Sequence, residues 1–120
     1  MTVTIYHNPK CSTSRHVLEA LREAGFEVNV IEYLKTPPSR AELARLAERA
    51  GLSVRDLLRR KSPRYDELGL GDGALTDDQL LAAIEDSPEL LERPLVAGAN
   101  KVMMVRPKDR VADFIAAERA

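Results

Sequence analysis

The chain has 120 residues, 44% of them hydrophobic and 31% charged, which predicts one ordinary globular domain over residues 1–120 that needs no metal or disulfide to fold. Its 18 basic and 19 acidic residues give a net charge of −1, and this argues against a nucleic-acid partner, which would need an uncompensated basic surface. A single cysteine excludes an internal disulfide and a cysteine-rich zinc site.

The first third of the chain is predicted to form a β-α-β unit. Residues 2–6 alternate in the manner of a strand, and Asn8-Pro9 marks the turn that ends it. Apolar residues at helical spacing follow as far as Gly25, a typical C-terminal helix cap, and residues 28–33 again have strand character. We expect the two strands to be parallel and joined by a right-handed crossover.

The middle of the chain, residues 39 to about 91, is predicted to be a helical insert. Capping boxes, in which a Ser or Thr is followed three residues later by Glu, Asp or Gln, start helices at Ser39, Ser53 and Thr76. Gly51 ends the first of these helices, and the glycine-rich residues 69–73 form a loop before the last one.

Strand character returns after the insert. Residues 95–96 and 102–105 flank a Gly-Ala-Asn turn and predict a hairpin. A last amphipathic helix is predicted from three apolar residues at helical spacing, Val111, Phe114 and Ile115. The element order β-α-β, helical insert, β-β-α predicts an α/β fold with a mixed four-stranded sheet.

The only cysteine, Cys11, is predicted to be a reactive thiol. It lies between the first strand and the first helix, where backbone N–H groups and the helix dipole favour negative charge and lower a thiol pKa. The alternative is a passively packed side chain, with the hydroxyls of residues 12–14 serving only as helix caps. A polar turn between Pro9 and three hydroxyl residues is a poor candidate for burial, which favours the reactive thiol.

The residues around Cys11 add to this hypothesis. Cys11 and Ser14 form a Cys-x-x-Cys dithiol pattern whose second cysteine is a serine, at the chain position where oxidoreductases of the thioredoxin type carry their active site. A redox cycle at Cys11 would therefore need a second thiol from outside the chain. Arg15 adds a cation suited to holding an anion, and His7 is either a neighbour of the sulfur or only a turn residue.

Three further arginines are candidates for binding an oxyanion, because guanidinium presents paired planar donors. Arg93 immediately precedes one predicted strand, Arg106 follows the next, and Arg59 lies in a basic cluster of the insert. Each of them is alternatively a solvated surface residue, and their spacing alone does not bring them to Cys11.

The sequence His-Asn-Pro-Lys-Cys-Ser-Thr-Ser-Arg at residues 7–15 closely resembles the active-site loop of the glutaredoxin-linked arsenate reductases of the ArsC type. The resemblance extends in one colinear order over nearly the whole chain. The other matching segments are residues 33–38, 53–59, 65–70, 75–80 and 92–96.

This resemblance implies a thioredoxin-like fold with a helical insert, a nucleophilic Cys11 and a cis peptide bond before Pro94. Ser14 matches a hydroxyl that helps to lower the thiol pKa, and Ser12 departs from the glycine that the family commonly has. The other roles implied are a site histidine and three anion-binding arginines: His7, Arg59, Arg93 and Arg106.

The activity implied is the reduction of arsenate to arsenite, with glutathione as co-substrate, glutaredoxin as partner, and no bound metal or other cofactor. A regulator of the Spx type, which binds RNA polymerase, is disfavoured because Ser14 interrupts the Cys-x-x-Cys pair. A monothiol oxidoreductase with another substrate is disfavoured by the arginines. No leader or membrane span is evident in the sequence, so we expect a cytoplasmic protein without a membrane partner.

Overall fold

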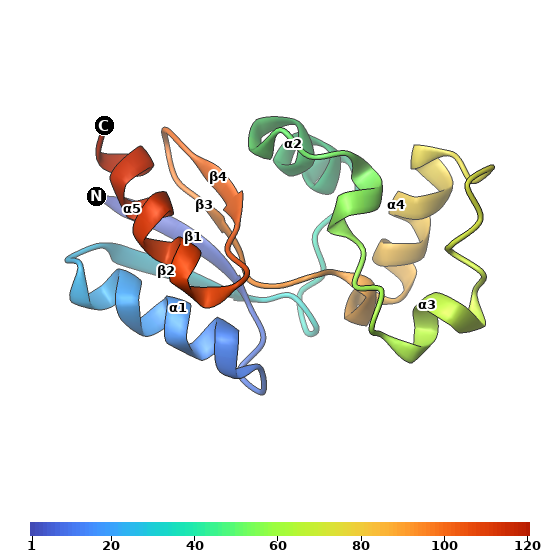
Figure 1. Cartoon of the computed structure of the whole chain (residues 1–120), viewed down its shortest axis with the longest axis horizontal. Coiled ribbons are helices and arrows are strands. Elements are labelled where there is room, and N and C mark those ends of the chain that lie inside the picture. Colours follow the sequence, from blue (N-terminus) through green and yellow to red (C-terminus); the bar gives the residue numbers. More distant parts are fainter. The chain divides into compact units, whose positions relative to one another are not determined.

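The two ends of the chain form one unit and its middle forms another. In the computed structural model, which describes all 120 residues, residues 1–36 and 93–120 make up the first unit and residues 37–92 the second. Figure 1 shows the second unit as helices joined by loops, and it corresponds closely to the helical insert predicted at about residues 39–91. The single domain over residues 1–120 stays a prediction.

The first unit contains a mixed four-stranded sheet, as predicted, and its strand order is β2-β1-β3-β4. The central strand β1 pairs in parallel with β2 and antiparallel with β3, and β3 and β4 form the predicted hairpin. The four strands are β1 (Thr2–His7), β2 (Glu27–Glu32), β3 (Leu95–Ala97) and β4 (Val102–Met104).

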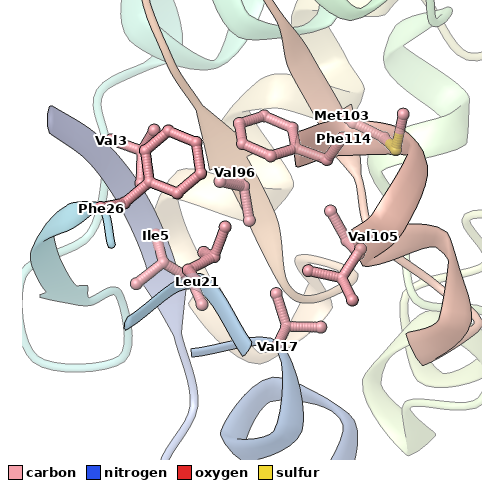
Figure 2. Close-up of a cluster of buried hydrophobic side chains, with 10 residues drawn as sticks. Val3, Ile5, Val17, Leu21, Phe26, Val96, Met103, Val105 and Phe114 are labelled. Atoms are coloured by element: carbon pink, nitrogen blue, oxygen red, sulfur yellow. The ribbon is translucent and has the colours of Figure 1, made fainter. Parts of the chain in front are cut away.

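Two helices, α1 (Ser12–Glu23) and α5 (Val111–Arg119), cover one face of this sheet. Alternate residues of β1, Val3 and Ile5, point into a cluster that contains Val17 and Leu21 of α1 and Phe114 of α5 (Figure 2). These five side chains are almost completely buried, because strand alternation and helical spacing direct them to the same layer. This core fixes the start of α1 against the end of β1.

The second unit consists of short helices, three of which start at the predicted caps. The hydroxyls of Ser39, Ser53 and Thr76 each accept a hydrogen bond from the backbone N–H three residues later. The segment after Ser53 is a 3-10 helix rather than an α-helix. The helical elements are α2 (Arg40–Ala50), η1 (Val54–Leu57), α3 (Pro63–Glu67), α4 (Asp77–Asp86) and η2 (Pro88–Leu90). No helix in the chain has both the length and the apolar character needed to cross a membrane.

A buried carboxylate holds the turn between β3 and β4. Glu118 of α5 is only 1% exposed, and its carboxylate accepts hydrogen bonds from the backbone N–H groups of Ala99, Asn100 and Lys101 at 2.9–3.0 Å. A Cβ at Gly98 would overlap this carboxylate, so the turn needs glycine at that position. The carboxylate thereby ties the hairpin to the last helix.

We expect Glu118→Gln to lower the free energy of unfolding by about 2–3 kcal/mol, because an amide NH₂ would face backbone N–H donors that then lose their charged acceptor. Urea denaturation followed by circular dichroism measures the change. The control is Glu19→Gln, which removes the same charge from an exposed position of α1 and should change stability by less than about 0.5 kcal/mol. Equal stability of the two variants would contradict the role of Glu118.

Candidate active site

Cys11 occupies the N-cap of α1, directly after the turn that follows β1, as the sequence predicted. Its backbone N–H donates to the carbonyl of Asn8 at 3.0 Å, and its own carbonyl accepts from the N–H of Arg15, the first bond of the helix. No acidic residue lies in the first turn of α1. The half-buried side chain is therefore placed at the positive end of the helix dipole, with no neighbouring carboxylate in that turn.

The guanidinium groups of Arg93 and Arg106 both reach the sulfur of Cys11. Nη1 of Arg106 donates to Sγ at 3.8 Å and to the carbonyl of Arg93 at 3.3 Å, and the Arg93 side chain also donates a hydrogen bond to the sulfur. The hairpin explains this convergence: Leu95, at the start of β3, pairs with Met104, at the end of β4. The residues just before β3 and just after β4 therefore lie at the same end of the sheet.

The pKa of the Cys11 thiol is lowered from its usual 9.0 to about 7. Partial burial raises this pKa. Hydrogen bonds from the backbone N–H of Ser14 and from the guanidinium groups of Arg93 and Arg106 lower it, as does the positive charge of Arg93, and together they outweigh burial. Ser14 is the third residue of α1. The backbone N–H at this helix position commonly donates a hydrogen bond to the side chain of the N-cap residue. Near pH 7 about half of the thiol is therefore thiolate.

This pKa predicts the pH dependence of alkylation at Cys11. The thiolate is the reactive form, so the rate with iodoacetamide should rise with pH and reach half of its maximum near pH 7. The same protein in concentrated urea serves as the control, and its midpoint should lie close to the usual 9.0. Since the chain has one cysteine, each rate reports on Cys11 alone. Coincident midpoints in the two states would contradict a stabilised thiolate.

His7 lies at the end of β1 and contacts Ser14 rather than the sulfur. Its Nδ1 is 2.6 Å from the Ser14 hydroxyl oxygen, which also accepts from the backbone N–H of Asn8 at 3.1 Å. Burial lowers the pKa of His7, although the negative charge of Glu32 acts in the opposite direction. The lowered pKa favours the neutral ring. With the ring neutral and Nδ1 as acceptor, the Ser14 hydroxyl donates to His7.

Ser14 acts on the Cys11 thiol through its backbone N–H, while its hydroxyl contacts His7 and the N–H of Asn8. That the hydroxyl also helps to lower the thiol pKa stays a prediction. The pair His7 and Ser14 joins the end of β1 to the first turn of α1. Both side chains are buried, so this link fixes the loop that carries Cys11.

The other two predicted arginines have different surroundings. Arg15, on α1, is exposed, and its Nη1 donates to the carbonyl of Pro9 at 2.8 Å, which braces the turn before Cys11. Arg59 belongs to the second unit, where its Nη1 forms a 2.8 Å salt bridge with the Glu92 carboxylate. Anion binding by Arg15 and Arg59 stays a prediction.

Sequence reasoning missed Asn8 as a site residue. Its side-chain oxygen accepts from the N–H of Lys10 and its carbonyl accepts from the N–H of Cys11, so it shapes the whole turn. The Asn-Pro sequence carried that signal, because Asn commonly hydrogen-bonds to the backbone two residues on. The predicted cis Arg93–Pro94 bond is confirmed, and the cis Arg106–Pro107 bond was not predicted.

A family model described as "ArsC family" matches residues 6–114, which include all of the site residues discussed above. The chain belongs to the ArsC family. An arsenate reductase of Rhizobium meliloti is 49% identical over 96% of this chain and 82% of its own length. An arsenate reductase of Escherichia coli is 47% identical over 94% of this chain and 80% of its own length.

ArsC structures also match the fold. A solved arsenate reductase from Vibrio cholerae superposes with a TM-score of 0.90 at 46% identity, covering 94% of this chain and 97% of that one. The predicted thioredoxin-like α/β fold with a four-stranded mixed sheet is therefore confirmed. In this ArsC chain the fold brings together Cys11, Arg93 and Arg106, which are widely separated in sequence.

Proposed function

We propose that this protein is an arsenate reductase whose nucleophile is Cys11. The observation that carries the proposal is a thiol with a pKa of about 7 that receives hydrogen bonds from two guanidinium groups. A thiolate held between cations is suited to attack an anionic electrophile, and the related arsenate reductases support arsenate as that electrophile.

Arg93 and Arg106 would offset the repulsion between the thiolate and its anionic substrate. Arsenate is largely a dianion near neutral pH, so an approaching thiolate is repelled unless cations lie between the two. Arg93 and Arg106 would bind the arsenate oxygens and stabilise the charge that builds up on them during attack. We include Arg15 in the proposal as a further cation for the same oxyanion, and His7 with Ser14 as the pair that fixes the Cys11 loop.

The proposed reaction proceeds in four steps. Cys11 attacks arsenic and a water leaves, which gives a Cys11 thioarsenate with arsenic still pentavalent. Glutathione adds through its sulfur and a second water leaves. A glutaredoxin thiol then attacks the glutathione sulfur, and the electron pair of the breaking S–As bond reduces arsenic to the trivalent state. Water finally releases arsenite and restores the Cys11 thiol. Overall, arsenate and two thiols give arsenite, one mixed disulfide and one water.

The lone cysteine supports an external source of electrons. Both electrons must come from thiols outside the chain, because Cys11 has no second cysteine with which to form a disulfide. We therefore propose glutathione as co-substrate and glutaredoxin as partner, in the reducing cytoplasm where both thiols are kept reduced. The proposed steps use no bound metal or organic cofactor.

A coupled assay tests this function. The protein is mixed with arsenate, glutathione, glutaredoxin, glutathione reductase and NADPH, and NADPH oxidation and arsenite are both measured. We expect one NADPH consumed for each arsenite formed, and no turnover when arsenate, glutathione or glutaredoxin is omitted. Turnover without arsenate would instead identify a thiol oxidoreductase acting on mixed disulfides. A folded protein that forms no arsenite would refute the proposed function.

A further inference from the structure

A cavity of about 270 Å³ lies at the carboxyl ends of β1 and β2. Its walls are the turn at residues 7–10 and three residues at and after the end of β2, Glu32, Leu34 and Lys35. His7 and Glu32, the last residues of the two parallel strands, pair in register, which explains why both turns border the same space. In open α/β sheets, ligands bind preferentially beyond the carboxyl ends of parallel strands.

The cavity and the nucleophile border the same turn, residues 7–10. Lys10, which lines the cavity, directly precedes Cys11, and Asn8, also in the wall, accepts the hydrogen bond from the Cys11 N–H. A ligand in the cavity would therefore lie against the same turn that holds the thiol.

The sheet order places the cavity and the arginines on opposite sides of β1. The order is β2-β1-β3-β4, so the cavity lies on the β2 side of the β1 end. Arg93 and Arg106 reach the sulfur from the β3–β4 side. Two different molecules can thus approach Cys11 without competing for the same groups.

The lining combines an apolar surface with both signs of charge. Leu34 is 46% exposed and, with Pro9, provides apolar contact area. The ammonium groups of Lys10 and Lys35 and the carboxylate of Glu32 supply two positive charges and one negative charge, and Lys35 lies 3.5 Å from Glu32. A complementary ligand would carry two carboxylates, one ammonium and a short apolar stretch.

We propose that this cavity binds the reducing peptide thiol, glutathione, beside the Cys11 turn. At neutral pH glutathione carries two carboxylates and one ammonium, the reverse of the charges of Lys10, Lys35 and Glu32. The proposal rests on the proposed function, since it assigns a place to the second substrate of that reaction. The oxyanion is bound on the arginine side of the sulfur and the thiol is delivered from the β2 side.

Titration with S-methylglutathione, which cannot react, tests the binding directly. The ligand is added to ¹⁵N-labelled Cys11→Ser protein and amide shifts are followed by NMR. We expect shifts at Asn8, Lys10 and residues 32–35, with a smaller effect at the arginine positions 93 and 106. Lys35→Glu should weaken binding about tenfold, since it replaces an attraction by a repulsion. The control Arg45→Glu makes the same charge change at an exposed position of α2 and should leave binding unchanged.

Kinetics with the intact thiol separates this proposal from the proposed function. In the coupled assay, Lys35→Glu should raise KM for glutathione about tenfold and leave KM for arsenate within twofold. Arsenate turnover without amide shifts at Asn8, Lys10 and residues 32–35, or with shifts confined to the arginine side, would overturn the cavity assignment. Shifts at the cavity in a protein that forms no arsenite would overturn the proposed function and support the cavity as a peptide-thiol site.

Discussion

Replacing Cys11 by serine is expected to abolish arsenite formation, with kcat lowered by about 10⁴-fold or more. A serine hydroxyl is not ionised near pH 7, whereas about half of the Cys11 thiol is thiolate at that pH. The chain also offers no other thiol that could replace the nucleophile. Arsenite measured in the coupled assay gives the result directly.

The control for this change is Ser12→Ala, which removes the neighbouring exposed hydroxyl and should alter kcat by less than about twofold. Circular dichroism should show the same fold for both variants, since Cys11 is half-buried and serine differs from it only by oxygen in place of sulfur. Arsenite formation by a folded Cys11→Ser protein at a rate near that of the wild type would remove Cys11 from the mechanism.

Replacing Arg106 by alanine is expected to have the next largest effect, a loss of about 10²–10³ in kcat/KM for arsenate. The change removes one of the two guanidinium groups at the sulfur and a donor to the Arg93 carbonyl. It should also raise the pKa of Cys11 above about 7, because a hydrogen bond that lowers this pKa is lost. The midpoint of alkylation against pH should move upward with it.

Arg106→Lys separates charge from geometry. A lysine keeps the positive charge but presents no planar pair of donors, so we expect an intermediate kcat/KM for arsenate. Alkylation of Cys11 at high pH should remain possible in both variants, because the thiol is intact. An unchanged kcat/KM in Arg106→Ala would mean that Arg106 contributes nothing to the reaction.

Local signals in the sequence accounted for most of the fold. The caps at Ser39, Ser53 and Thr76 are where the sequence placed them, because capping depends on residues only three positions apart. The helix Pro63–Glu67 escaped prediction because it has five residues and buries none of them, so it leaves no apolar stripe. The strand predicted at residues 28–33 is Glu27–Glu32, a shift of one residue at each end.

The site was predictable in part. The location of Cys11 at a helix start followed from local sequence, but the approach of Arg106 depends on a contact between residues 95 positions apart. Only the resemblance to a family, not spacing, indicated that contact. The carboxylate of Glu118 was not anticipated, since an acid near the end of an amphipathic helix is usually solvent-exposed.

The separation of Cys11 from its arginines along the chain has a consequence during synthesis. The ribosome makes Cys11 early, while Arg93 and Arg106 follow only after the whole segment 37–92. Until β3 and β4 add to β1, the thiol lacks the guanidinium donors that lower its pKa. A nascent chain would therefore carry a cysteine of ordinary reactivity, and the activated thiolate would arise only when the sheet closes.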